Sequence, residues 1–371
     1  MSWGTIITAF QFSIMQMTGW TNYLAHVGAC LDFGPLPVRV NFGALQADAN
    51  ALAHNAVAVP LFHLGLIRAT GEEATSFLHK LFSSDVAGLT DNAAQWASFN
   101  TAQGRMLANF LLWRDGDGLC LATSADLAPA ILRKLSFYIL RAKVKLSLPE
   151  QERALIGLAG AKAGEYLLRA ALPVPDADMR QAISDNRRTI RLNDSLFILD
   201  LPAAEAPAAF DALCQAGITA SGTASWQLAA IRAGLPLITA ATQEAFVAQM
   251  LNFEIIGGVS FAKGCYPGQE IIARTQYLGK PKRRMFRIGL RSAASIAGIS
   301  AGTALYSPPL ESKDGQAAGI IVNFAPLPDG GEALAVIRVE CTHAGNEVHI
   351  GAPDGPCAQV LGLPYEVPET K

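Results

Sequence analysis

The sequence predicts an α+β protein that ends in a separate small β-domain. Over the first two thirds of the chain, amphipathic helical stripes alternate with short apolar strands, and glycine-containing turns join several strands into hairpins. After residue 282 the helical stripes stop and only short apolar strands remain. With 371 residues, the chain is long enough for two or three domains with cores of their own. We expect an N-terminal segment over 1–55, α+β domains over 56–150 and 151–282, and a C-terminal β-barrel over 283–371.

The first α+β domain begins with a buried strand over 61–70 that Gly71 ends. Apolar residues then recur at the spacing of one helical face, at Ala74, Phe77, Leu78, Leu81 and Phe82. Further strands are expected at 96–101, 105–113, 119–123 and 144–148, and a second helix at 126–141. This order resembles the ferredoxin-like β-α-β-β-α-β unit, so we expect an antiparallel sheet and not a doubly wound nucleotide-binding fold.

The second α+β domain reads as a weaker copy of the first. Its strands are expected at 154–159, 189–192 and 196–201, and its helices at 164–171 and 203–215. Five short strands follow in the last part of the chain, at 285–290, 304–307, 318–324, 334–340 and 347–350. Regularly spaced short strands close on themselves, which predicts a β-barrel or sandwich of roughly 85 residues.

Composition and charge exclude several classes of protein. The net charge of −2 argues against a protein whose main task is to cover nucleic-acid phosphates, so we expect no strong direct nucleic-acid binding. Six cysteines without a C-x-x-C pair indicate reduced thiols in a cytoplasmic compartment. No stretch approaches the roughly 20 apolar residues that a membrane span needs, so we expect no membrane association. The apolar patch at 6–10 follows no Lys or Arg, unlike a signal peptide; a true start at Met15 or Met17 is an alternative.

The densest chemical motif is at residues 263–270, which read Lys-Gly-Cys-Tyr-Pro-Gly-Gln-Glu. Proline suits a first helical turn and an acidic residue suits a helix N-terminus, so a helix is expected to begin just after Cys265. The helix terminus and Lys263 would then both lower the pKa of the Cys265 thiol. Gly264 and Gly268 would let a planar ligand or a neighbouring loop come close. The alternative is a tight turn in which a small cysteine only packs.

This octapeptide resembles the signature of the YgfZ family of folate-binding proteins, which are related to the glycine-cleavage aminomethyltransferase. The resemblance continues in Gly-Leu-Ile-Arg at 65–68, in Gly-Glu-Glu-Ala at 71–74, in Gly-Arg-Met-Leu-Ala-Asn at 104–109 and in Ile-Arg-Ala-Gly-Leu-Pro at 231–236. It implies an aminomethyltransferase-like fold around a central channel, tetrahydrofolate or a derivative as cofactor, and iron–sulfur enzymes as clients, among them enzymes that modify tRNA. The Cys265 loop is implied to lie beside the channel.

The sequence also departs from the aminomethyltransferase branch of this resemblance. A catalytic Asp is implied in the strand after the glycine turn, where this chain has Ala108 and Asn109. The Gly-Tyr-Thr-Gly-Glu segment of that branch, whose Glu pairs with the pterin, is missing near 191–200. Folate binding is therefore expected without glycine cleavage.

The candidate site residues follow from the motif and from its surroundings. Cys265 is expected to be the reactive thiol, with Lys263 as its catalytic partner. The candidate folate-binding residues are Tyr266, Gly268, Gln269, Trp226, Arg232 and Asn109. An aromatic ring can stack on folate and a guanidinium can pair with its carboxylates. Trp226 is equally compatible with a core position.

Three further patterns have weaker functional meaning. The glycines at 157–164 fit no nucleotide-binding pattern, and a close strand-to-helix turn explains them. The spacing of Cys341, His343, His349 and Cys357 fits no usual metal site, and we expect no metal. The basic residues Lys280, Lys282, Arg283, Arg284 and Arg287 could contact RNA phosphates or a folate glutamate tail, or could form a solvated linker face.

Three functions are compatible with these features. The leading one is a folate-binding accessory protein that helps to assemble, repair or maintain iron–sulfur clusters through Cys265. Without clustered cysteines, it should not hold a cluster stably by itself. The alternative is a tetrahydrofolate-dependent one-carbon transferase or demethylase, which would need an acid or base that Ala108 does not provide. The third is a scaffold in which the loop is only structural.

Overall fold

A computed structural model describes residues 18–33, 38–43, 45–149, 152–279, 281–291, 296–307, 317–342 and 347–367 of the chain. The chain forms two compact units. Unit 1 consists of Met1–Leu78, Val86–Gln95 and Phe110–Ala229, and unit 2 consists of His79–Asp85, Trp96–Asn109 and Ala230–Lys371. The expectations about residues 1–17 lie outside the described residues. The predicted domain boundaries near residues 55, 150 and 282 stay predictions.

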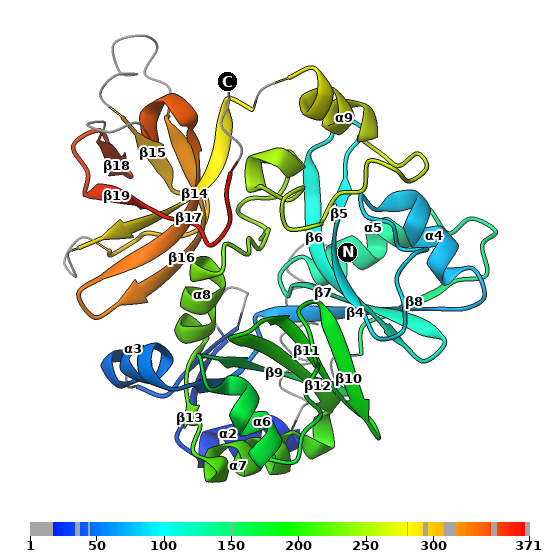
Figure 1. Cartoon of the computed structure of the whole chain (residues 1–371), viewed down its shortest axis with the longest axis vertical. Coiled ribbons are helices and arrows are strands. Elements are labelled where there is room, and N and C mark those ends of the chain that lie inside the picture. The colour runs from blue at the N-terminus through cyan, green and yellow to red at the C-terminus, as the bar shows by residue number, and fades with distance from the viewer. Residues whose placement is uncertain are drawn as a thin grey trace. The chain divides into compact units, whose positions relative to one another are not determined.

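Unit 1 contains a six-stranded sheet in the order β10-β11-β12-β9-β3-β13. Its strands are β3 (Val57–Pro60), β9 (Arg153–Ala159), β10 (Arg180–Ser184), β11 (Arg187–Asn193), β12 (Leu196–Pro202) and β13 (Thr219–Ala220). Neighbours are antiparallel except β3 and β13, which run parallel. Three helices pack their apolar faces against this sheet: α2 (Thr18–His26), α6 (Ala163–Arg169) and α7 (Ala206–Ala216) (Figure 1). Strands β10, β3 and β13 were not separately predicted.

Local sequence explains where these helices face and end. In α7 the buried residues Ala206, Ala209, Phe210 and Leu213 form one helical stripe. The helix ends at Gly217, whose φ of 109° suits a left-handed C-cap that glycine adopts without strain. The two-stranded sheet of β1 (Cys30–Asp32) and β2 (Arg39–Asn41) and the helix α3 (Leu45–His54) complete the early part of unit 1.

A second sheet has the order β5-β6-β7-β4-β8. Its strands are β4 (Leu64–Thr70), β5 (Ala94–Asn100), β6 (Met106–Asp115), β7 (Gly118–Ser124) and β8 (Lys145–Ser147), and its helices are α4 (Ala74–Leu81) and α5 (Ala128–Ser136). The predicted elements are therefore present, and the three strands expected between the helices are β5, β6 and β7, one more than the ferredoxin-like unit has. Helix α5 ends five residues before the predicted residue 141. The strand expected at 61–70 is β4, which begins three residues later, at Leu64; β3 precedes it and pairs in the other sheet.

The last part of unit 2 is a closed six-stranded barrel in the order β14-β17-β16-β15-β18-β19, which confirms the predicted barrel. Its strands are β14 (Arg283–Leu290), β15 (Ala304–Tyr306), β16 (Gly319–Leu327), β17 (Gly330–Arg338), β18 (Val348–Ile350) and β19 (Cys357–Leu361), drawn from yellow to red in Figure 1. Its core is built from alternating inward side chains such as Ile288, Leu305, Ile321, Ala335 and Val348. Strand β19 was not predicted.

Two helices remain, α8 (Thr223–Arg232) and α9 (Gln269–Tyr277), together with the short 3-10 helices η1 (Ala203–Glu205), η2 (Ala248–Leu251) and η4 (Val339–Thr342). No helix in the described part of the chain combines the length and the apolar character that crossing a membrane requires. The last two residues of the octapeptide, Gln269 and Glu270, form the first turn of α9, which anchors that end of the octapeptide.

Candidate functional site

The octapeptide loop lies in unit 2 and leads directly into α9. The helix begins at Gln269, so its start is three residues later than the sequence predicts. Gly268 precedes it with a φ of 80°, a left-handed conformation that favours glycine. The backbone N–H of Gln269 donates to the Tyr266 carbonyl at 3.2 Å, which closes the turn between loop and helix. Cys265 therefore lies about one turn before the helix.

Gly268 also permits a close backbone contact that no other residue type would allow. A Cβ atom at this position would lie 2.5 Å from the Thr101 carbonyl oxygen and 2.6 Å from the Gly104 Cα. The loop therefore packs directly on the turn between β5 and β6. Gly264 differs, because a Cβ atom there would meet no heavy atom within 4 Å. Of the two loop glycines that were expected to allow close approach, only Gly268 is in close contact.

The Lys263 side chain fixes the other end of the loop. Its Nζ donates to the carbonyl oxygens of His79 and Phe82, the latter at 2.5 Å, and lies 5.0 Å from the centre of the Tyr266 ring. Burial lowers the pKa of Lys263 to about 8, and the Asp85 carboxylate opposes this shift. The expectation that this charge favours the Cys265 thiolate stays a prediction, because the described contacts of Nζ are to carbonyls and to an aromatic ring.

Two buried polar side chains near the loop lack hydrogen-bond partners among the described residues. Tyr266 is 6% exposed, and its Oη has no partner. Burial raises the pKa of Tyr266 to about 12. Asn100 is 2% exposed, and neither atom of its amide has a partner. Buried polar atoms are rarely left unpaired, so such positions indicate a bound water or ligand.

Asn100 was missed by sequence reasoning, although one signal could have found it. It is the last residue of β5 and directly precedes Thr101, on whose carbonyl Gly268 packs. A polar residue at the end of a buried strand, before a turn that contains glycine, is a position where side chains meet ligands.

The six cysteines differ in exposure. Cys30, Cys265 and Cys357 are exposed, Cys214 is half-buried, and Cys120 and Cys341 are buried. Burial raises the pKa of the Cys120, Cys214 and Cys341 thiols. Cys265 is thus one of three thiols that solvent can reach, and it is the one inside the octapeptide.

The other predicted folate-binding residues do not gather around the loop. Asn109 is buried, and its side-chain amide is hydrogen-bonded to the backbone. It donates to the Pro236 carbonyl and accepts from the Ile238 N–H, both at 2.8 Å. Arg232 donates to the Glu332 carboxylate at 2.7 Å and 3.1 Å. Trp226 belongs to unit 1, where it is 5% exposed and packs on Gly157. Gln269 begins α9 and is half-buried.

The weaker sequence patterns have structural explanations. The glycines at 157–164 join β9 to α6, and Gly160, with a φ of 121°, packs on the backbone of Asn55. No group of three His, Cys, Asp or Glu side chains that could hold a metal ion is found among the described residues. His343 and Lys280 lie outside those residues. Arg283, Arg284 and Arg287 belong to strand β14 and not to a linker.

Comparisons with known proteins agree with this architecture. No family model matches the chain. A tRNA-modifying protein YgfZ of Escherichia coli O157:H7 (strain EC4115 / EHEC) is 30% identical over 220 residues, which cover 58% of this chain and 67% of that protein. The protein of the same name from Escherichia coli O7:K1 (strain IAI39 / ExPEC) is 28% identical over 306 residues, or 81% of this chain and 90% of that one.

A solved structure supports the same relationship at the level of the fold. The glycine cleavage system aminomethyltransferase T from Bartonella henselae matches with a TM-score of 0.75 and 20% identity, over 92% of this chain and 96% of that one. The chain therefore has an aminomethyltransferase-like fold of mixed helices and sheets with a small closed barrel. The curated relatives, one of them 30% identical over 67% of its own length, show that the chain belongs to the YgfZ family.

Proposed function

We propose that this protein is a folate-binding accessory protein that supports iron–sulfur enzymes, including enzymes that modify tRNA, and that it uses the Cys265 thiol. The observation that carries the proposal is an exposed cysteine on a loop whose two ends are fixed, by Lys263 on one side and by Gly268 on the other. The relatives are named as tRNA-modifying proteins, which supports the link to tRNA.

The arrangement of the loop suits a thiol that meets a partner molecule. The contacts at both ends of the loop restrict where Cys265 can lie, and its exposure lets a bulky client reach it. We propose Lys263 as a positioning residue, because its ammonium holds the loop against the carbonyls of His79 and Phe82. A cluster would be transient cargo at this single thiol, bound through one iron–thiolate bond, since stable clusters are usually held by several cysteines.

The residues around the loop fit a folate. Tyr266 Oη and the Asn100 amide are buried polar atoms without partners among the described residues, and together they can donate and accept hydrogen bonds. The edge of a pterin ring carries both donors and acceptors, so it could satisfy them. We propose that Tyr266 and Asn100 would hold the folate, with Gln269 and the backbone at Gly268 beside them. Folate would supply a carrier for one-carbon groups.

One-carbon transfer as the main activity has less support. Ala108 is buried and has no carboxylate, and the neighbouring Asn109 amide is already bonded to backbone atoms on both of its sides. Neither position offers a group that can move a proton to or from a folate nitrogen.

Complementation of a strain that lacks its own family member tests the role of the thiol. Wild type is expected to restore the activities of iron–sulfur enzymes and the tRNA modifications that depend on them, whereas Cys265→Ala should restore neither. Cys357→Ala is the matched control, because it removes another exposed thiol and should behave as wild type. Full restoration by Cys265→Ala would contradict the proposal. Lys263→Met is expected to restore these activities only in part. Lys263→Arg should restore more of them, because it keeps a cation that can donate to the carbonyls of His79 and Phe82.

Calorimetry with tetrahydrofolate tests the cofactor separately. Wild type is expected to bind, and Asn100→Ala together with Tyr266→Phe should weaken binding by about tenfold or more, since each loses a hydrogen bond in a buried site. Absence of measurable heat for wild type would reject folate binding. Formation of methylenetetrahydrofolate from an aminomethylated carrier protein would favour the transferase instead.

A further inference from the structure

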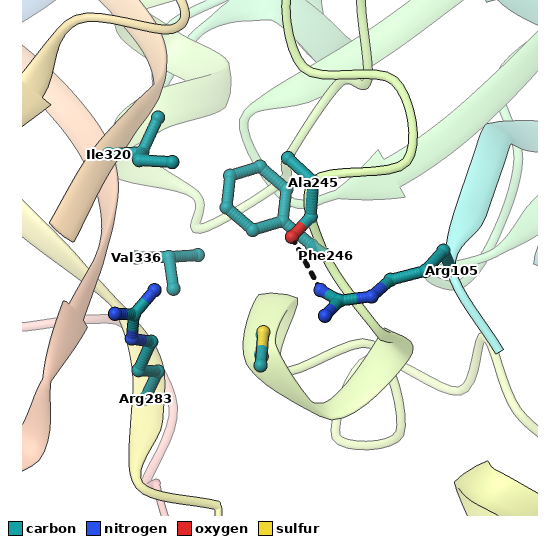
Figure 2. Close-up of a pocket in the computed structure, with 7 residues that line it drawn as sticks. Arg105, Ala245, Phe246, Arg283, Ile320 and Val336 are labelled. Carbon is teal, nitrogen blue, oxygen red and sulfur yellow. Dashed lines mark hydrogen bonds between the residues drawn. The ribbon is translucent and has the colours of Figure 1, made fainter. Parts of the chain in front are cut away.

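A cavity of about 240 Å³ lies in unit 2, and no residue of the octapeptide lines it. Its wall is formed by Arg105, Phe246, Met250, Arg283, Ile320 and Val336, together with Ala245. Arg105 and Arg283 approach it from opposite sides, with the Phe246 ring between them and the apolar barrel residues beside Arg283 (Figure 2). The cavity therefore combines two cations with an apolar surface.

The wall of the cavity is held by regular backbone contacts. Arg105 forms a β-bridge with Val247, and the Met106 N–H donates to the Phe246 carbonyl at 2.8 Å. On the barrel side, Ile320 of β16 and Val336 of β17 are direct cross-strand partners. Phe246 and Val336 are each 2% exposed, so their apolar surfaces are firmly packed at the back of the cavity. A ligand would meet a site that is already formed.

Neither guanidinium has an acidic partner among the described residues. Arg105 donates one N–H to the carbonyl of Ala245 at 2.8 Å, which is a neutral acceptor. Its guanidinium has four further N–H donors. Burial, followed by the positive charges of Arg338 and Arg105, lowers the pKa of Arg283. The cations around this cavity thus repel one another, and an anion between them would relieve that repulsion.

The arginines near Arg283 on β14 and β17 differ from it, because each of them has a carboxylate within reach. Arg284 pairs with Glu254, and Arg287 lies 3.9 Å from Glu332. Arg338, the cross-strand partner of Arg283, lies 3.6 Å from Glu340. Three of these four neighbouring arginines therefore have a carboxylate in reach, and the one that lines the cavity does not.

We propose that this cavity binds a small organic anion, whose carboxylate or phosphate group lies between Arg105 and Arg283 and whose apolar part packs on the half-buried side chains of Met250 and Ile320. Guanidinium groups bind such anions through paired hydrogen bonds and also stack on flat rings. A volume of about 240 Å³ is roughly eight times that of one water molecule in the liquid, so the part of the ligand inside is about the size of one substituted ring. This site does not depend on the ligand of the octapeptide loop being a folate.

A ligand-observed NMR titration of the full chain tests the site with three single-ring probes. We would use 4-aminobenzoate as the carboxylate, phenyl phosphate as the phosphate and 4-aminobenzamide as the neutral analogue. At least one anion should bind saturably, and the amide should bind at least about tenfold more weakly because it lacks the charge-assisted hydrogen bonds. Preference for one anion over the other identifies which group the site takes.

Variants show whether the two arginines are responsible. Arg283→Gln and Arg105→Gln should each weaken binding of the preferred anion by about tenfold or more. Lys282→Gln is the matched control, since it removes the same charge from the neighbouring exposed residue and should change affinity by less than about twofold. The proposal is overturned if neither anion binds saturably, if the amide binds as well as the anions, or if Lys282→Gln weakens binding as much as Arg283→Gln.

Discussion

Lys263 ends in a half-buried ammonium that donates to two backbone carbonyls, those of His79 and Phe82. Burial lowers the pKa of Lys263 from 10.5 to about 8, so the folded protein releases this proton at a lower pH than the unfolded chain does. Between these two values the unfolded chain holds more protons than the folded protein, and the free energy of unfolding therefore rises with pH. The neutral amine can still donate to both carbonyls.

Comparison of wild type with Lys263→Met at several pH values tests this. The free energy of unfolding of wild type, relative to the variant, is expected to increase as the pH rises from about 8 to about 10, and to be flat below about 7. Urea unfolding followed by circular dichroism would measure it. Lys282→Met, which removes an exposed lysine, should give no such change. A constant difference between wild type and Lys263→Met across this range would show that the ammonium is not held as described.

Single residues also show how far the sequence alone could lead. The octapeptide pointed to Cys265, Lys263 and Tyr266 as one group because they are adjacent in the sequence, whereas the carbonyls that Lys263 contacts, those of His79 and Phe82, are more than 180 residues away. The contacts of Asn109 and Arg232 could not be predicted from their neighbours in the sequence. The two hydrogen-bond partners of the Asn109 amide, at Pro236 and Ile238, are 127 and 129 residues away, and Arg232 pairs with Glu332 across 100 residues. The residue types of Asn109 and Arg232 suggested ligand binding. In the fold, however, their polar side-chain atoms are hydrogen-bonded to residues that are distant in the sequence.

At the scale of elements, the start of α9 depends on one close contact between two turns. Gly268 has a φ of 80°, and its Cα faces the Thr101 carbonyl and Gly104 so closely that a side chain cannot fit. Helix α9 is held at its other side by Gln249 of η2, whose Nε2 donates to the Ile272 carbonyl at 2.7 Å. The octapeptide is therefore positioned by backbone contacts and not by its own side chains alone.

Gly268→Ala is expected to lower the free energy of unfolding by about 1 to 3 kcal/mol, because it adds strain at positive φ and displaces the β5–β6 turn. It should also change the rate at which Cys265 is alkylated. Gly264→Ala is the matched control in the same loop, since no heavy atom lies within 4 Å of the added Cβ, and it should change stability by less than about 0.5 kcal/mol. Equal effects of the two substitutions on stability would contradict this explanation.

The elements also show which signals are local. The amphipathic stripe of α4 and the regular short strands of the barrel were predicted because their apolar periodicity is complete within each segment. Strand β3, which lies before the predicted strand at 61–70, was missed, because it has only four residues and is defined by its pairing with β9. Strand β10, with a half-exposed pattern, and the short β19 carry too few apolar residues to be recognised.

At the scale of the whole molecule, the chain passes between the two units five times, after residues 78, 85, 95, 109 and 229. Four of these passages lie inside regular elements, namely α4, β5, β6 and α8. Each of these helices and strands contributes residues to both units. Loss of structure in one unit would therefore shorten elements that the other unit needs. A division by sequence into consecutive domains would not reveal this sharing.

The shared elements predict that both units unfold in one cooperative transition. Two buried cysteines report on the units separately: Cys120 of β7 in unit 1 is 2% exposed, and Cys341 of η4 in unit 2 is 1% exposed. Brief alkylation at increasing urea concentrations, followed by mass spectrometry, would give the midpoint at which each thiol becomes reactive. We expect the two midpoints to coincide, because neither unit keeps complete helices and strands without the other. Exposed Cys30 and Cys357 should react at every urea concentration and so calibrate the reagent. A midpoint for Cys341 well below that for Cys120 would mean that the barrel region unfolds by itself and that the continuous elements do not couple the units.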